Sequence, residues 1–204
     1  MDGQDYLNQI SAENRPVKKS KSGIFSSKIF MAIMIGVIAL VFIIIVGSII
    51  GNGKSSEKEL SYALKLHIDN TSKVISEYQP EVKSSDLRSH SASLNGVLSN
   101  TTRELTDYLT SKYDFKEKDV PQKLVDEAQL EMDGLEADLF EAKINGILDR
   151  IYAHKMAYEI SMLMSEENKL LNSTGDEAFQ NILSTSYSSL ENLYSKFNDF
   201  SEAS

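Results

Sequence analysis

The sequence predicts an all-α protein: a single N-terminal transmembrane helix followed by an antiparallel bundle of four or five helices. A run of 22 residues, Ile29–Ile50, carries no charge and has Ser48 as its only polar side chain. The rest of the chain is rich in Leu, Ala, Glu, Lys and Ser and contains few helix breakers, a composition that favours helices. Its apolar residues recur every three or four positions, and no stretch shows strand-like alternation.

The apolar run has the length of a membrane span. At about 1.5 Å per residue it would extend roughly 33 Å, slightly more than the hydrocarbon core of a bilayer. A buried core helix is the competing interpretation, but such helices rarely exceed about 14 apolar residues without a polar face. We predict that Ile29–Ile50 anchors the chain in the lipid bilayer as a single-pass helix. It has no ionisable residue for an ion or proton pathway.

The flanks of the run predict its orientation. Residues 1–28 are polar, include the basic cluster Arg15–Lys21, and are predicted to be a disordered cytoplasmic tail. Because Lys and Arg concentrate before the span, we expect the N-terminus in the cytoplasm and the C-terminal domain outside the plasma membrane. A cleaved signal peptide is the alternative, but its apolar region would be only about 7 to 15 residues long. An uncleaved signal anchor is therefore favoured.

Charge and cysteine content exclude several classes of function. The formal net charge is −9; five basic and three acidic residues lie before Lys54, so 16 basic and 27 acidic residues follow. So acidic a domain repels nucleic acid, and no nucleic-acid partner is expected. The absence of cysteine excludes disulfides, thiolate metal ligands and a cysteine nucleophile. The domain must be held together by packing alone.

A linker, 51–56, separates the span from a predicted bundle over 57–200 and a tail over 201–204. Ser56 and Glu59 form a capping-box pattern for the first helix, which Pro80 ends. The apolar stripe of this helix is Leu60, Leu64, Ile68, Thr71, Val74 or Ile75, and Tyr78. A second helix is expected from Ser84 or Ser85 to about Lys112. Its stripe is Leu87, Leu94, Val97, Leu98, Thr101, Leu105, Tyr108 and Leu109.

The charged segment Lys112–Pro121 is predicted as a loop. Pro121 suits the first turn of a third helix, with Asp119 as a possible cap. The stripe of that helix is Leu124, Ala128, Met132, Leu135 and Leu139. The pair Asn145-Gly146 then predicts either a kink or a break, since glycine costs about 1 kcal/mol in a helix relative to alanine.

A fourth helix and a fifth helix complete the predicted bundle. The fourth carries Ile147, Ile151, Met156, Tyr158, Ile160, Leu163, Met164 and Leu171. A turn over Asn172–Gly175 leads to the last helix, which runs from Asp176 to about Phe200. Its apolar residues are Phe179, Ile182, Leu183, Leu190, Leu193, Tyr194 and Phe197. Tyr187, Tyr194 and Phe197 stand at helical spacing and are predicted as core residues.

Helical bundles often hold a di-metal centre, which needs carboxylates from several helices and Glu-x-x-His pairs. The three histidines, His67, His90 and His154, lack an acidic residue three positions before them. Asp86 and His90 could share a helical face, but one pair chelates weakly. No metal ligand or cofactor is therefore predicted.

His154 is the remaining candidate ligand. It lies among Tyr152, Tyr158 and Glu159 on the most apolar helix of the domain. A histidine in that setting is more typical of a core or boundary position with a hydrogen-bond partner than of a metal site.

The acidic run Glu131–Lys143 is similar to a ligand-rich helix, but its acidic residues alternate with apolar ones. We predict that Glu131, Asp138 and Glu141 form a solvated face. No Ser–His–Asp set, phosphate-binding glycine loop or calcium loop is present in the sequence. Three Asn-x-Ser/Thr sequons, at Asn70, Asn100 and Asn172, are expected by chance in this composition. No catalytic residue is predicted, and the protein is expected not to be an enzyme.

Two stretches give the chain a resemblance to a known family. QPEVKSSDLRSH, Gln79–His90, and GILDRIYAHKMAYEISML, Gly146–Leu163, resemble the family called domain of unknown function 4142, which comprises bacterial, ferritin-like helical proteins of the cell envelope. The resemblance implies a ferritin-like bundle and an envelope location. The family tends to carry a histidine near the position of Glu159 and another in the final helix, and both are missing here. No ligand role is carried over.

The sequence thus predicts a membrane-anchored, non-enzymatic module that binds a protein, an envelope polymer or a second copy of itself. Two alternatives remain. One is a degenerate metal-binding ferritin-like protein that uses His154 with nearby carboxylates. The other is a ligand-sensing ectodomain, although the cytoplasmic tail 1–28 holds no signalling domain.

Overall fold

The structure, a computed structural model, describes residues 56–203 of the chain. This part of the chain consists of helices α3 (Glu57–Tyr78), α4 (Ser85–Tyr113), α5 (Gln122–Ile144), α6 (Leu148–Ser173) and α7 (Glu177–Ala203), with the 3-10 turns η2 (Gln79–Glu81) and η3 (Glu117–Asp119). It contains no strand. The predicted all-α class is therefore confirmed for the described residues.

The predicted membrane span, Ile29–Ile50, and the tail 1–28 lie outside the described residues. Within residues 56–203, no helix is both long and apolar enough to cross a bilayer. Anchoring through Ile29–Ile50 therefore stays a prediction.

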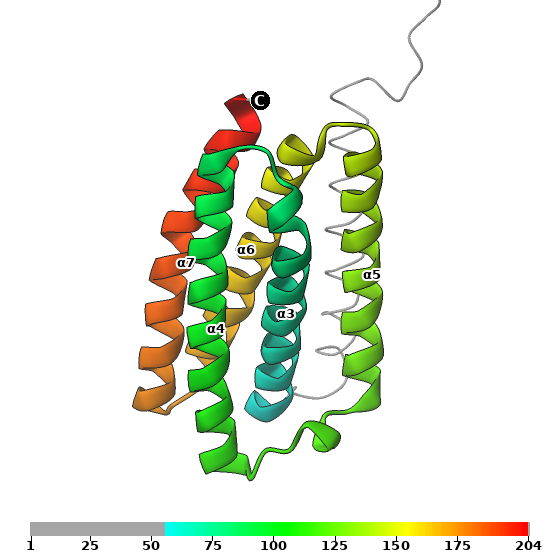
Figure 1. The fold of residues 1–204 in the computed structure, drawn as a ribbon. Coiled ribbons are helices and arrows are strands. Elements are labelled where there is room, and N and C mark those ends of the chain that lie inside the picture. Colours follow the sequence, from blue (N-terminus) through cyan, green and yellow to red (C-terminus); the bar gives the residue numbers. More distant parts are fainter. Residues whose placement is uncertain (1–55, 204) are drawn as a thin grey trace, which may run out of the picture. The chain divides into compact units, whose positions relative to one another are not determined.

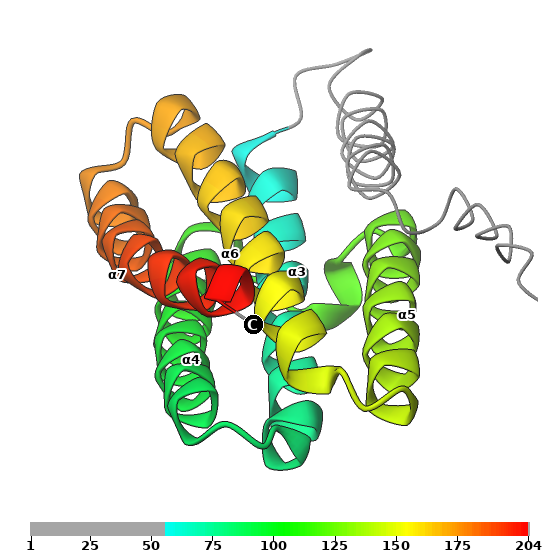
Figure 2. The same cartoon turned by 90° about the horizontal axis from the view of Figure 1, so that it is seen from above.

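Four of the helices enclose the core, and the fifth lies outside them. α3 packs against α4, α4 against α7, α7 against α6, and α6 against α3, which closes a ring around the apolar interior. α5 packs against α3 and α6, and Figure 2 shows it beside that pair and away from α4 and α7. Consecutive helices run in opposite directions (Figure 1). The described residues thus form five helices, four in a ring and one packed outside it, in agreement with the prediction of four or five.

Most of the core comes from the predicted stripes, but the fully buried Tyr152 was assigned to none of them, and Tyr158, which was, is only half-buried. The largest fully buried side chains of the core are Tyr152, Phe179, Phe197, Leu64, Ile68, Ile75, Leu87, Leu94, Leu98, Leu105, Leu109 and Leu139. Val74 and Ile75 are both buried, so the choice between them was unnecessary. The chain crosses from α4 to α5 near the start of α3, where Phe115 packs on Tyr62 with ring centroids 5.1 Å apart. Phe115 thereby covers the end of the core that the four helices leave open.

Two aromatic residues predicted as core are not in it. Phe197 is fully buried, but Tyr194 is 36 % exposed and Tyr187 is half-buried. Both line an open hollow between α6 and α7. Ile147, predicted in the stripe of the fourth helix, is 40 % exposed because it precedes α6 in the turn after α5.

The helix ends follow local chemistry. The capping box of α3 is confirmed: Glu59 N donates to Ser56 Oγ, and Ser56 N donates to the Glu59 carboxylate. Ser84 caps α4 through Leu87 N, which confirms a start at Ser85. The prediction for α5 was wrong in detail. Pro121 occupies the N-cap position rather than the first turn, and Asp119 lies in η3 and caps nothing.

The pair Asn145-Gly146 breaks the helix rather than kinking it. Gly146 adopts a positive φ of 71°, a conformation that favours glycine, and its N–H donates to Lys143 O. Two further boundaries differ from prediction. α6 continues to Ser173, into the predicted turn, and α7 continues to Ala203, so that 201–203 is helical rather than a tail.

A polar cluster ties the first turn of α3 to the end of α4. Glu57 Oε1 accepts hydrogen bonds from Lys112 Nζ at 2.7 Å, Tyr108 OH at 2.7 Å and Tyr113 OH at 2.9 Å. Burial alone would raise the pKa of Glu57, but these hydrogen bonds lower it to about 2. Lys112 also approaches Asp176 at 3.6 Å. The domain therefore begins on a charged cluster shared by α3, α4 and the start of α7.

Candidate functional site

A histidine–glutamate cluster lies between α3 and α6, beneath α5. His67 on α3 points between two carboxylates of α6: its Nε2 lies 2.8 Å from Glu159 Oε2, and its Nδ1 lies 3.1 Å from Glu166 Oε2. Glu159 and Glu166 are seven residues apart, so they share one face of α6 two turns apart. All three side chains are largely enclosed, with exposed fractions of 11 %, 15 % and 18 %. We call these three residues the His67 cluster.

The geometry sets the protonation of His67. A carboxylate accepts hydrogen bonds, so both ring nitrogens must donate, and the ring is a charged imidazolium. Burial lowers the pKa of His67, but the charges and hydrogen bonds of Glu166 and Glu159 outweigh burial and raise it well above the usual value. The cluster holds two carboxylates and one cation, which leaves one negative charge.

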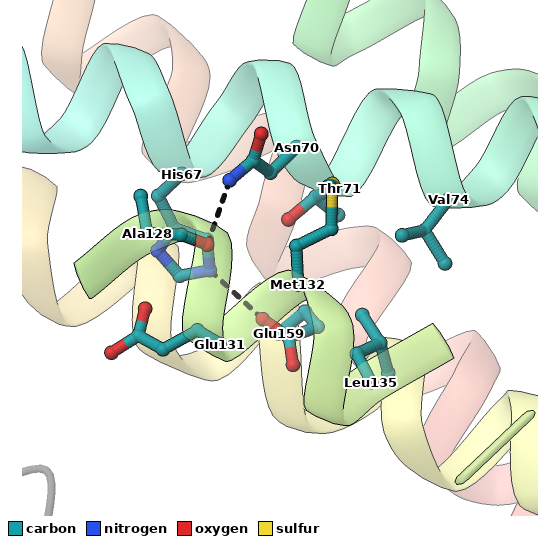
Figure 3. Close-up of a pocket in the computed structure, with 9 residues that line it drawn as sticks. All are labelled: His67, Asn70, Thr71, Val74, Ala128, Glu131, Met132, Leu135 and Glu159. Atoms are coloured by element: carbon teal, nitrogen blue, oxygen red, sulfur yellow. Dashed lines mark hydrogen bonds and ion pairs between the residues drawn. The ribbon is translucent and has the colours of Figure 1, made fainter. Parts of the chain in front are cut away.

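A third carboxyl adjoins the cluster from α5. Glu131 lines a small pocket with His67 and Glu159, and Figure 3 shows its side chain beside the imidazole. The pocket holds about 20 Å³, room for one water-sized group, and is also lined by Asn70, Thr71, Val74, Ala128, Met132 and Leu135. Enclosure by its neighbours raises the pKa of Glu131 to about 7; the charges of Glu166 and Glu159 add to the rise and that of His67 opposes it.

The prediction that Glu131 lies on a solvated face of α5 is therefore incomplete. Glu131 is an exposed residue of α5, as are Asp138 and Glu141, but its carboxyl group borders the His67 cluster and is partly shielded from solvent there. Asp138 forms an ion pair with Lys155 of α6. Asn70, the first residue of one sequon, donates to Ala128 O at 2.9 Å and holds α5 on α3.

The His67 cluster is arranged as an ion pair shared by one imidazolium and two carboxylates. Each ring nitrogen of His67 faces a different carboxylate, so no nitrogen lone pair is directed to a point shared with both glutamates. Among residues 56–203, no group of three or more His, Asp or Glu side chains has the geometry to hold a metal ion. No hydroxyl lies within hydrogen-bonding distance of His67, so the cluster also lacks a nucleophile paired with its base among the described residues.

The two other histidines lie elsewhere. His154 is half-buried on α6, has no hydrogen-bond partner in the described part of the chain, and has its pKa lowered by burial and by the charge of Lys155. His90 lies edge-on against Phe197, with ring centroids 6.1 Å apart, and makes no contact with Asp86 that would pair them as ligands. The expectation of a hydrogen-bond partner for His154 is not met among the described residues.

Glu167 is a second buried carboxyl. It is fully buried on α6, and neither carboxylate oxygen has a hydrogen bond within the described residues. Burial raises its pKa to about 8, although the nearby Ser186 hydroxyl lowers it in part. Ser186 itself accepts a hydrogen bond from Thr101 of α4 at 2.9 Å. Glu167 is thus protonated at neutral pH and lies in the interface of α6 with α7.

Sequence reasoning missed the His67 cluster. His67 lies 92 and 99 residues from its partners, and no local motif joins them. The only signals are indirect: His67 falls directly before Ile68 in the buried stripe of α3, and Glu159 and Glu166 recur at a two-turn spacing on α6.

The outer face of α5 is a second candidate site. Leu130, Phe140 and Ile144 are 71 %, 59 % and 68 % exposed, although all three are large and apolar. They lie on the side of α5 opposite its buried residues, which are Met132, Leu135, Leu139 and Ala142. We call Leu130, Phe140 and Ile144 the α5 stripe. A helix with apolar residues on two faces is typical of one that contacts a further partner.

Comparison with family models, curated proteins and solved structures finds no match for this chain. The resemblance to the domain of unknown function 4142 family, and the ferritin-like description that it implies, stay predictions.

Replacing His67 by glutamine tests the shared ion pair. The variant leaves Glu159 and Glu166 without their shared cation, so we expect the free energy of unfolding at pH 6 to fall by about 2–4 kcal/mol. The measurement is denaturant unfolding of the full chain in nonionic detergent, followed by helical circular dichroism. The raised pKa of His67 makes its contribution complete below pH 6.5 and lost as the pH rises through the folded-state value. The deficit of the variant should therefore shrink at alkaline pH.

His154→Gln is the matched control for that experiment. It makes the same replacement at a histidine without a partner, and we expect a change of less than about 1 kcal/mol. An equal loss of stability in both variants would contradict the shared ion pair.

Glu167→Met tests the buried carboxyl. The folded-state pKa of about 8 lies above the usual value of 4.5, so the protonated carboxyl adds stability that is complete below pH 4.5 and lost as the pH rises through 8. Methionine has similar volume and no group to ionise. We expect Glu167→Met to stabilise the domain by about 1–3 kcal/mol at pH 9 and by less at pH 6. Glu191→Met, at an exposed position of α7, should show no such pH dependence.

Proposed function

We propose that the protein is a membrane-anchored, non-enzymatic module whose helical domain binds a partner protein through the outer face of α5. The α5 stripe is the observation that carries this proposal. The predicted anchor, Ile29–Ile50, and the predicted extracytoplasmic position of the domain supply its setting. No reaction is assigned to the His67 cluster, which stabilises the contact between α3 and α6.

The chemistry of α5 indicates what kind of partner it takes. Asp126 and Asp133 lie on the same side of the helix as the α5 stripe, and Glu141 lies at its border. The whole helix carries seven acidic residues and two lysines. A complementary surface would place Lys or Arg beside apolar side chains. We therefore propose that the partner presents a basic amphipathic segment, which would lay its apolar side chains along Leu130, Phe140 and Ile144.

The same charges argue against two other occupants. A second copy of α5 would bring Asp126, Asp133 and Glu141 against their own equivalents, and like charges in contact disfavour association. Anionic lipid headgroups would be repelled in the same way. A partner of opposite charge is the occupant that the α5 stripe favours.

Membrane anchoring has its own test. Ile38→Arg combined with Phe42→Arg places two charges in the predicted span, each costing about 2.5–3.5 kcal/mol at a bilayer centre. We expect the full chain to move from the carbonate-resistant membrane fraction to the soluble fraction, whereas Ser48→Ala should leave it in the membrane. An N-terminal tag should remain on the mature protein. Loss of that tag would replace the signal anchor with a cleaved signal peptide.

Photo-crosslinking from the α5 stripe tests the partner. A benzophenone amino acid in place of Phe140, in the full chain in its native membrane, should form a crosslink to one protein. Mass spectrometry should locate the crosslink in a segment that has Lys or Arg beside apolar residues. Leu130→Ser with Ile144→Ser should abolish the crosslink without changing the helical content, because both side chains are exposed.

The matched control places the benzophenone at Tyr194, an exposed aromatic position on α7. The proposal predicts no crosslink to the same segment from there. Crosslinks from Phe140 mainly to lipid, to a second copy of the chain, or equally from both positions would contradict it.

A further inference from the structure

A hollow of about 440 Å³ lies at one end of the bundle. Its walls are the turn between η2 and α4 and the turn between α5 and α6, which lie at the end opposite the first turn of α3 (Figure 1). The residues that line it are Glu81, Lys83, Lys143, Gly146, Ile147, Leu148, Asp149 and Arg150. Its volume is in the range of small-ligand sites.

The lining of the hollow has three basic and two acidic residues, a net charge of +1, although the domain is acidic. Three of its residues are basic, and the side chains of Lys83 and Arg150 have neither an ion pair nor a hydrogen bond within the described residues. Lys143 forms a 3.2 Å ion pair with Glu81, in which both side chains are about half exposed. An exposed pair of this kind contributes little and is readily exchanged. Lys83 and Arg150 are therefore free to bind a ligand, and Lys143 can join them if the ligand displaces Glu81.

The carboxylate of Asp149 is hydrogen-bonded to the backbone. Its two carboxylate oxygens accept hydrogen bonds from Lys83 N at 2.9 Å and Ser84 N at 2.8 Å, at the N-terminus of α4. A carboxylate at a helix N-terminus is stabilised by the helix dipole. Asp149 thus links α6 to α4, and its carboxylate oxygens face backbone N–H groups rather than the side chains of Lys83 or Arg150.

Both walls of the hollow are fixed by hydrogen bonds. Arg88 donates to Val82 O at 2.6 Å and to Lys83 O at 2.9 Å, which holds the first turn in place together with Asp149. In the second turn, Ile147 N donates to Ala142 O at 3.0 Å, beside the positive-φ residue Gly146. A site whose walls are already ordered loses little conformational entropy when it binds.

We propose that this hollow is a binding site for a small anion that carries two or more phosphate or carboxylate groups. Arg150 supplies a planar guanidinium that can hold two oxygens of one group, and Lys83 and Lys143 supply point charges for a second group. Ile147 and Leu148 offer an apolar surface to the carbon part of the ligand. The net acidity of the surrounding domain disfavours a long polyanion, so the ligand is a small molecule or a single terminal group.

The carboxylate of Glu81 competes with an incoming anion for Lys143. A ligand that binds Lys143 must displace the Glu81 carboxylate, which also repels the incoming anion from the rim. Removing the charge of Glu81 should strengthen binding, whereas removing a charge of the three cations should weaken it. A site defined only by nonspecific attraction to surface lysines would not distinguish Lys83 from a lysine at the opposite end of the bundle.

Isothermal titration calorimetry on the full chain in nonionic detergent tests the site, with pyrophosphate and citrate as the two probes and acetate as a monovalent control. We expect saturable one-to-one binding of at least one probe and none of acetate. Lys83→Gln and Arg150→Gln should each weaken binding about tenfold, as expected for loss of one charge-assisted hydrogen bond. Glu81→Gln should tighten it about threefold by removing a weak exposed ion pair.

Lys118→Gln is the matched control, because Lys118 is an exposed lysine in η3 at the other end of the bundle. It should leave the affinity unchanged. All four substituted side chains are exposed, so circular dichroism should report unaltered helical content. The proposal is overturned if neither probe binds saturably, if Lys118→Gln weakens binding as much as Lys83→Gln, or if Glu81→Gln weakens it. Preference for pyrophosphate or for citrate identifies the ligand as a phosphate or a carboxylate.

Discussion

The imidazolium of His67, held between Glu159 and Glu166, sets the register of α3 against α6. Apolar side chains can slide past one another by a turn at modest cost, but a cation with a carboxylate on each ring nitrogen fits only one alignment. α5 then packs over the pair through a short apolar seam and two side-chain bonds to its backbone, from Asn70 to Ala128 and from Tyr78 to Glu136. Displacing the histidine would therefore disturb the attachment of α5 as well as the pairing beneath it.

α5 has two apolar faces, and this property joins the fold to the proposed function. One face covers the groove between α3 and α6, and the other, the α5 stripe, is not covered by any of residues 56–203. In a chain without disulfides, apolar surface left outside the core makes no contribution to the stability of the monomer. Its retention on a helix crowded with carboxylates is consistent with recognition of a basic partner. The hollow beside Lys83 and Arg150 begins where the α5 stripe ends, since Lys143 of the hollow directly precedes Ile144 of the stripe.

The helices could be predicted from sequence because the apolar residues that repeat every three or four positions are the ones the core buries. Ser56 and Ser84 also marked helix starts correctly, since capping depends on neighbours a few residues away. The features of the candidate site that could not be predicted from the sequence depend on contacts between distant residues. His67 meets glutamates nearly a hundred residues away, and Glu131 changes from a surface carboxylate to one bordering a pocket only because α5 packs beside α3. Tyr194 shows the reverse error, a core-like spacing on a face that the described part of the chain leaves exposed.

The cluster around Glu57 has a mechanical consequence. Glu57 is the first residue of α3, and its carboxylate accepts hydrogen bonds from Tyr108, Lys112 and Tyr113 at the C-terminal end of α4. Tension applied to the backbone at residue 56 would pass at once into α4 and, through Asp176, towards α7, instead of unwinding the first turn of α3. Several hydrogen bonds would then have to shear together. A pull on the start of α3 would therefore load the domain as a single block.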